Sequence, residues 1–75
     1  MYNQGIVVYS AKIKKTIDYF RFTVHDFGMI YLDGKFLGSV DRSKERNKII
    51  GIECLLHTCQ LDIVVEAMGH INFGH

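Results

Sequence analysis

The stretch GMIYLDGKFLGSV, residues 28–40, decides the fold class of this chain. Asp33 and Gly34 lie between two apolar runs, the pattern of a two-residue type I′ hairpin turn, because both turn positions need a positive φ that Asp and Gly tolerate well. Such a turn also predicts the register of the two strands. Outward from the turn, the predicted pairs are Leu32 with Lys35, Tyr31 with Phe36, Ile30 with Leu37, and Met29 with Gly38.

Both faces of this predicted hairpin are apolar. One face carries Met29, Tyr31, Phe36 and Val40, and the other carries Ile30, Leu32 and Leu37. A hairpin with one face in water alternates apolar and polar residues instead. We therefore expect an opposing sheet to cover one face and a neighbouring domain or subunit to cover the other.

The rest of the chain continues the β pattern and shows no long helical stripe. We expect further strands at 5–13, 16–24, 49–56 and 61–67, turns or loops at 25–28, 41–48 and 57–60, and an irregular tail at 68–75. Short strands at this spacing predict a single all-β domain over residues 1–75, an antiparallel β-sandwich or jelly roll. Complete sandwiches usually have about seven or eight strands, so we expect an incomplete one.

Composition narrows the function classes. The 75 residues are 48% hydrophobic and 23% charged, with a net charge of +1, which excludes a disordered chain. A net charge this small does not create the positive electrostatic potential that a nucleic-acid-binding protein needs. No run of about 18 apolar residues is present, so we expect a soluble chain with neither a membrane nor a nucleic-acid partner.

The two cysteines do not form a recognisable framework. The sequence is compatible with either a disulfide between Cys54 and Cys59 or two free thiols. With His57 and His75 they offer four nominal zinc ligands, but C-x2-H-x-C matches no common structural site. We expect neither a metal nor another cofactor.

The acidic residues near the strands do not predict catalysis. A retaining glycosidase pair needs two carboxyl groups that converge in one cleft. Asp62 and Glu66 are expected on the solvent face of their strand, and Glu53 lies in another strand. Asp33 and Gly34 are interpreted as turn residues rather than as a ligand loop.

Two segments resemble glycoside hydrolase family 35. Residues 24–42, VHDFGMIYLDGKFLGSVDR, resemble its "hDyA" turn, "VFVDGKxxG" hairpin and "xLDR". Residues 61–74, LDIVVEAMGHINFG, are similar to its "LDILVENMGRxNYG". Residues 4–13 resemble the strand "GYGxxLYRT" more weakly, and all three follow the order of the family.

The resemblance implies a galactose-binding-like jelly roll that packs on the catalytic (β/α)₈ barrel of a β-galactosidase. That family removes terminal β-linked galactose with retention, using two Glu residues at the ends of barrel strands. No part of this sequence matches those motifs, so the chain alone is expected to be no enzyme. The cellular address of the parent is left open among secreted, periplasmic and lysosomal-like.

The last segment departs from the family pattern. His70 stands where the family usually has Arg, and Ala67 often corresponds to Asn. By resemblance this segment faces the rest of the enzyme, so His70, Asn72 and Phe73 are predicted to lie at an interface or near a sugar. The family sequence also runs on beyond His75, so we expect an unpaired sheet edge that favours self-association.

Two functions follow as hypotheses. The leading one is a non-catalytic accessory module that packs on the barrel of a family 35 β-galactosidase. The alternative is an autonomous galactoside-binding module, which would stack sugar rings on exposed aromatic side chains. Its candidate residues are Tyr2, Tyr9, Tyr19 and Asn72.

Overall fold

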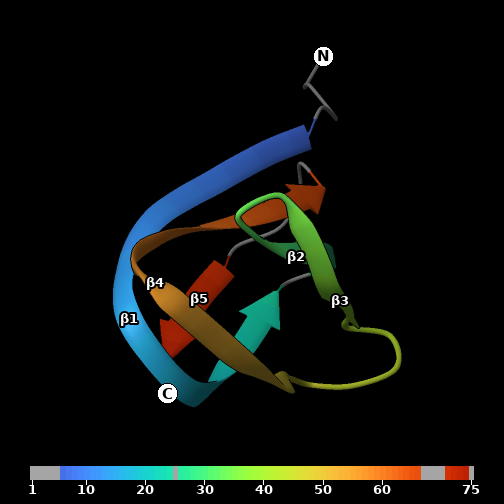
Figure 1. Cartoon of the computed structure of the whole chain (residues 1–75). Helices are drawn as coiled ribbons and strands as arrows, with labels where there is room; N and C mark the ends of the chain where they lie inside the picture. Colours follow the sequence, from blue (N-terminus) through green and yellow to red (C-terminus); the bar gives the residue numbers. More distant parts are fainter. Residues whose placement is uncertain (1–5, 25, 67–70, 75) are drawn as a thin grey trace.

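The computed structural model describes residues 6–24, 26–66 and 71–74, and these form a single antiparallel β-sheet. Its strands are β1 (Ile6–Val24), β2 (Phe27–Leu32), β3 (Lys35–Asp41), β4 (Lys48–Glu66) and β5 (Ile71–Gly74). They lie in the order β3-β2-β4-β1-β5 (Figure 1). The predicted all-β antiparallel class is therefore confirmed. Within the described ranges, no helix is long and apolar enough to cross a membrane.

The two longest strands, β1 and β4, bend together. Each has 19 residues and they pair along most of their length. The register shifts between Lys14, which lies opposite Thr58, and Thr16, which lies opposite Cys54. Three residues of β4, 55–57, therefore stand against Lys15 alone, and such a bulge bends the strand that contains it. Figure 1 shows β1 curving around one side of the molecule as a result.

The bend folds the sheet into two layers that share one core. The first layer contains residues 6–14 and 58–66 with β2 and β3, and the second contains residues 16–24 and 48–54 with β5. Apolar side chains from both layers form one buried cluster: Phe22, Val24, Ile50 and Ile52 from the second layer, and Ile30, Val40, Leu61, Ile63 and Val65 from the first. The inward sides of the two layers thus face each other, as in a sandwich.

Two predicted boundaries are wrong because the bulge bends the strands without ending them. Residues 5–13 and 16–24 were expected to be separate strands, yet β1 is continuous. The predicted loop at 57–60 lies inside β4. Its polar residues are exposed positions of a strand whose Cys59 and Leu61 are buried.

The hairpin register agrees with the prediction only next to the turn. Tyr31 pairs with Phe36 and Leu32 with Lys35, but an irregularity between Ile30 and Tyr31 shifts the remaining pairs by one residue. Ile30 pairs with Gly38 instead of Leu37, and Met29 pairs with Ser39 instead of Gly38. Val40 consequently lies in the core with Ile30, and its predicted place beside Met29 and Tyr31 is wrong.

Two further segments are more ordered than predicted. The turn expected at 25–28 is shorter, because β2 begins at Phe27. Part of the tail expected to be irregular forms β5, which pairs with residues 21–24 of β1. Backbone hydrogen bonding to an available edge of β1 explains a strand here despite the glycine content.

Cys54 and Cys59 are joined by a disulfide across the bend of β4. Their Cα atoms lie 5.9 Å apart. Five residues along a straight strand would separate them by about 16 Å. The bridge therefore closes the bend and connects the two layers. Of the two states that the sequence allowed, the cysteines form the disulfide rather than two free thiols.

Candidate interaction surface

The outward side of the first layer carries a group of apolar side chains with polar residues around it. Val8 lies opposite Val64 on the neighbouring strand, and Val64 lies opposite Met29 on the next. Directly opposite residues share one side of a sheet. The alternation along the four strands adds further members to this side. We define the outer face as Ile6, Val8, Phe27, Met29, Tyr31, Phe36 and Val64.

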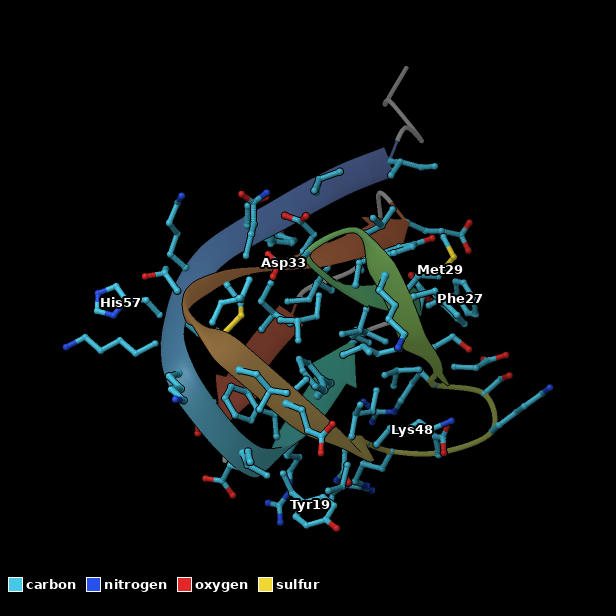
Figure 2. The ribbon with its side chains drawn as sticks, viewed as in Figure 1. Tyr19, Phe27, Met29, Asp33, Lys48 and His57 are labelled. Atoms are coloured by element: carbon cyan, nitrogen blue, oxygen red, sulfur yellow. A yellow bond between two sulfur atoms is a disulfide. The ribbon has the colours of Figure 1, made fainter. Side chains whose placement is uncertain are left out.

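The outer face is poorly covered by the chain itself. Ile6 is 65% exposed, Val8 56% and Phe36 53%. The other four members are half-buried. Exposed apolar side chains grouped on one surface mark an interaction site, whereas scattered ones do not. Figure 2 shows Phe27 and Met29 on the same side of the molecule.

Three members of the outer face hold one another in place. The rings of Tyr31 and Phe36 meet edge to face, with centroids 5.5 Å apart. The Tyr31 hydroxyl lies 3.9 Å from the Met29 sulfur, to which it donates a weak hydrogen bond. Side chains ordered in advance lose less entropy when a partner binds.

The Asp62 carboxylate lies on the same side of the sheet, opposite Tyr31, and already has its own hydrogen-bond donors. The Ser10 hydroxyl donates to Asp62 Oδ1 at 2.6 Å, and the Gln60 amide donates to both oxygens at 3.0 and 3.2 Å. The Ser10 bond first, and the Gln60 bonds second, lower the pKa of Asp62 below its ordinary value. The Asp62 carboxylate is therefore already stabilised, so a partner that covers the outer face does not have to supply a basic side chain to it.

A groove lies where the hairpin tip approaches the second layer. It has a volume of about 460 Å³. Its lining contains Ile17, Asp18, Tyr19, Leu32, Lys35, Leu37, Gly51, Ile52 and Glu53. The lining mixes apolar side chains with charges of both signs.

The comparison with known families matches the whole chain. A family model described as "Beta-galactosidase, first all-beta domain" covers residues 1–75. The chain belongs to this family. Searches of curated proteins and of solved structures found no match. Membership implies a parent β-galactosidase with a catalytic domain.

The three acidic residues singled out in the sequence of this β-galactosidase domain, Glu53, Asp62 and Glu66, lie in separate places. Glu53 lines the groove at the hairpin tip, whereas Glu66 lines a separate hollow together with Asp41 and Arg42. Asp62 accepts hydrogen bonds from Ser10 and Gln60 and lies opposite Tyr31. The described residues thus bring no two of these three carboxyl groups together.

Asp33 and Gly34 form the turn of the β-galactosidase domain's hairpin. Their φ angles are 49° and 84°, both in the left-handed region that a type I′ turn requires. Asp33 also hydrogen-bonds to Gln60 of β4 through its backbone and its side chain. These contacts give Asp33 a structural role.

The tail residues are only partly described. His70 lies outside the described residues, as does His75. The backbones of Asn72 and Phe73 lie in β5, opposite Thr23 and Phe22. Their roles at an interface or near a sugar remain predictions.

Of the nominal zinc ligands, Cys54, His57 and Cys59 lie among the described residues, and these three form no metal site. Both cysteine sulfurs are taken up by the disulfide, and His57 points away from the core (Figure 2). Across residues 6–24, 26–66 and 71–74, no three His, Cys, Asp or Glu side chains lie close enough to hold a metal ion.

The hairpin part of the outer face is predictable from the sequence, whereas the contribution of β1 and β4 is not. Ile6, Val8 and Val64 complete the face from strands that are distant in sequence. A signal was present, because residues 6–8 and 63–65 are apolar without alternation. Strands that are apolar on both sides need cover on both sides.

Proposed function

We propose that this β-galactosidase domain is a non-catalytic accessory module of a family 35 enzyme and that it packs on the catalytic (β/α)₈ barrel through the outer face. The observation that carries the proposal is the exposure of apolar side chains from four neighbouring strands on one side of the sheet. The resemblance of residues 24–42 and 61–74 to family 35 supports the choice of family.

The composition of the outer face supports a permanent interface rather than a transient one. Permanent interfaces are more hydrophobic and depleted of charge at their centre. The seven apolar or aromatic members of the outer face have carboxylates only around them, with Glu66 opposite Ile6, Asp41 opposite Phe27 and Asp62 opposite Tyr31. A broad apolar surface of a neighbouring domain is the better match.

The proposal is tested by adding this chain to the catalytic domain of a family 35 β-galactosidase whose own first all-β domain has been deleted. Sedimentation velocity should show a complex. Val8→Lys and Phe36→Lys each place a charge in the outer face and should weaken that complex at least tenfold. Both positions are exposed, so thermal unfolding should change little.

Thr58→Lys is the matched control, because Thr58 is exposed near the bend and lies outside the outer face. It should leave the complex intact. Absence of any complex with the unchanged chain, or equal weakening by Thr58→Lys, would overturn the proposed function.

An autonomous galactoside-binding module is the alternative, and one described aromatic residue favours it. Tyr19 is 71% exposed and lines the groove at the hairpin tip. Tyr9, by contrast, packs against the core. Titration of galactose and lactose into the ¹⁵N-labelled chain tests this function directly. Shifts confined to residues around Tyr19 would support it, and none at millimolar sugar would remove it.

A further inference from the structure

The second layer also has an apolar outward side, separate from the outer face. Tyr19 lies opposite Gly51, Ile17 opposite Glu53, and Arg21 opposite Ile49. Ile17 and Tyr19 are each 71% exposed and Ile49 is 57% exposed. We call these six residues the Tyr19 face.

The Tyr19 face and the outer face point away from each other. The alternate residues Phe22, Ile50 and Ile52 of the second layer lie in the core, where they meet Ile30 and Ile63 of the first. Since the inward sides of the layers face each other, their outward sides diverge. Figure 2 shows Tyr19 directed away from the body of the molecule, far from Phe27 and Met29. One flat partner surface does not cover both faces.

The Tyr19 ring is supported from below by a glycine. A Cβ atom at Gly51 would lie 3.4 Å from Tyr19 Cε1 and 3.7 Å from Cδ1. The ring therefore lies against the Gly51 backbone and stands as a ridge near the middle of this face. Such a large, supported aromatic side chain is typical of the centre of an interface.

Opposite charges flank the ridge. Arg21 lies beside Ile49 at one end of the face, and Glu53 lies beside Ile17 at the other end and on the other strand. A partner of complementary charge would present an acid near Arg21 and a base near Glu53. A second copy related by a two-fold axis satisfies both requirements, because an isologous contact places residue i against j and j against i.

We propose that the Tyr19 face is a self-association surface, in which two copies of this domain pack face to face about a two-fold axis. Arg21 of each copy meets Glu53 of the other, and the Tyr19 side chains lie near the axis. This contact uses side chains on a sheet face, so it differs from the pairing of open strand edges expected from the sequence.

The proposed contact has the character of a weak dimer. Only three apolar side chains per copy contribute to it, so it belongs with interfaces below about 1,200 Å² of total buried area. Rim charges confer orientation and salt dependence more than affinity. The dimer is therefore expected to dissociate on dilution and to weaken as salt is raised.

The test is sedimentation equilibrium of the full chain over a concentration series at low and high salt. The unchanged chain should show a monomer–dimer equilibrium that high salt weakens. Arg21→Glu and Glu53→Arg should each weaken the dimer at least tenfold, because each places like charges together. The double variant Arg21→Glu/Glu53→Arg should restore the dimer, which a general loss of stability cannot do.

Val8→Lys is the control that separates this inference from the proposed function. It alters the outer face and should leave the dimer unchanged, while Arg21→Glu should leave barrel binding unchanged. A chain that is monomeric at all concentrations would overturn the inference. So would a dimer that resists both charge reversals, or one that Val8→Lys abolishes.

Discussion

Asp33 and Gln60 are joined by two hydrogen bonds that fix the hairpin turn to β4. The Asp33 amide donates to the Gln60 carbonyl at 2.8 Å, and the Gln60 amide donates to Asp33 Oδ1 at 2.8 Å. Figure 2 shows Asp33 at the turn beside β4. Gln60 lies just beyond the bend of β4, so this pair sets where β2 begins its pairing with that strand. The geometry of the turn thereby positions Tyr31 and Phe36 on the outer face.

Replacing Asp33 with Ala should destabilise the domain by roughly 2–3 kcal/mol, because the change removes a charge-assisted hydrogen bond and leaves a β-carbon residue in the left-handed region. Asp33→Asn is the matched control. Asn tolerates positive φ and retains an acceptor oxygen, so its cost should stay below about 1 kcal/mol. Urea unfolding measures both changes. Equal losses would show that the side-chain oxygen and the turn conformation are not what Asp33 supplies.

Reduction of the disulfide between Cys54 and Cys59 should lower the free energy of unfolding by about 2 kcal/mol, the chain-entropy value for so short a loop. The variant Cys54→Ser/Cys59→Ser should match the reduced chain and should not respond to dithiothreitol. Denaturant unfolding with and without reductant measures the effect. An unchanged midpoint on reduction would mean that strand pairing alone maintains the bend.

The part of the fold that follows from local chemistry was predictable. Asp33-Gly34 specifies the turn, and the turn specifies the pairs next to it. The pairs farther along depend on an irregularity after Ile30 that no residue type in the hairpin signals. It moves Val40 into the core beside Ile30. Placement of Val40 is thus decided by packing against the second layer.

The bend of β1 and β4 was not predictable for a related reason. Thr58 and Gln60 are residues that occur in loops, and the sequence around them contains no proline or glycine to mark a bulge. The side of the strand that is buried changes from even to odd positions between Cys54 and Cys59. That change is visible in the sequence only when the disulfide and the two-layer arrangement are already known.

The existence of an exposed apolar face was predictable from the sequence, but the full set of residues on it was not. Met29, Tyr31 and Phe36 indicated a surface that needs cover, and they do lie on it. The contribution of Val8 and Val64 depends on the strand order, with β4 between β1 and β2. A strand order of this type is set by long-range pairing rather than by local sequence.

Gly28→Ala should destabilise the domain by about 1–3 kcal/mol through overpacking. A Cβ atom at this position would lie 2.9 Å from Val24 Cγ1 and 3.7 Å from the Val64 carbonyl oxygen. Val24 is buried in the core and cannot move without displacing its neighbours. Gly51→Ala is the control, because its nearest contact is the exposed Tyr19 ring at ordinary van der Waals distance. Thermal unfolding should therefore show a clear loss for Gly28→Ala and a small one for Gly51→Ala.

Acid should destabilise the domain through two carboxylates whose pKa is lowered in the folded state. The pKa of Asp62 is lowered by the hydrogen bond from Ser10 and then by those from Gln60. The pKa of Asp41 is lowered by hydrogen bonds from the Ser43 hydroxyl and amide and then by the charge of Lys44. A carboxyl group whose pKa is lowered by folding binds a proton more readily in the unfolded state. Its contribution to the free energy of unfolding is therefore fully present above the unfolded pKa, near 3.8. That contribution is lost as the pH falls through the lower pKa of the folded state.

The melting temperature should therefore be insensitive to these two groups at neutral pH and should fall below about pH 4. Asp62→Asn should flatten that fall, because the amide does not titrate. Melting curves between pH 2 and 7 give the comparison. If Asp62→Asn and the unchanged chain lose stability in parallel, the Ser10–Asp62 bond makes no contribution that depends on ionisation.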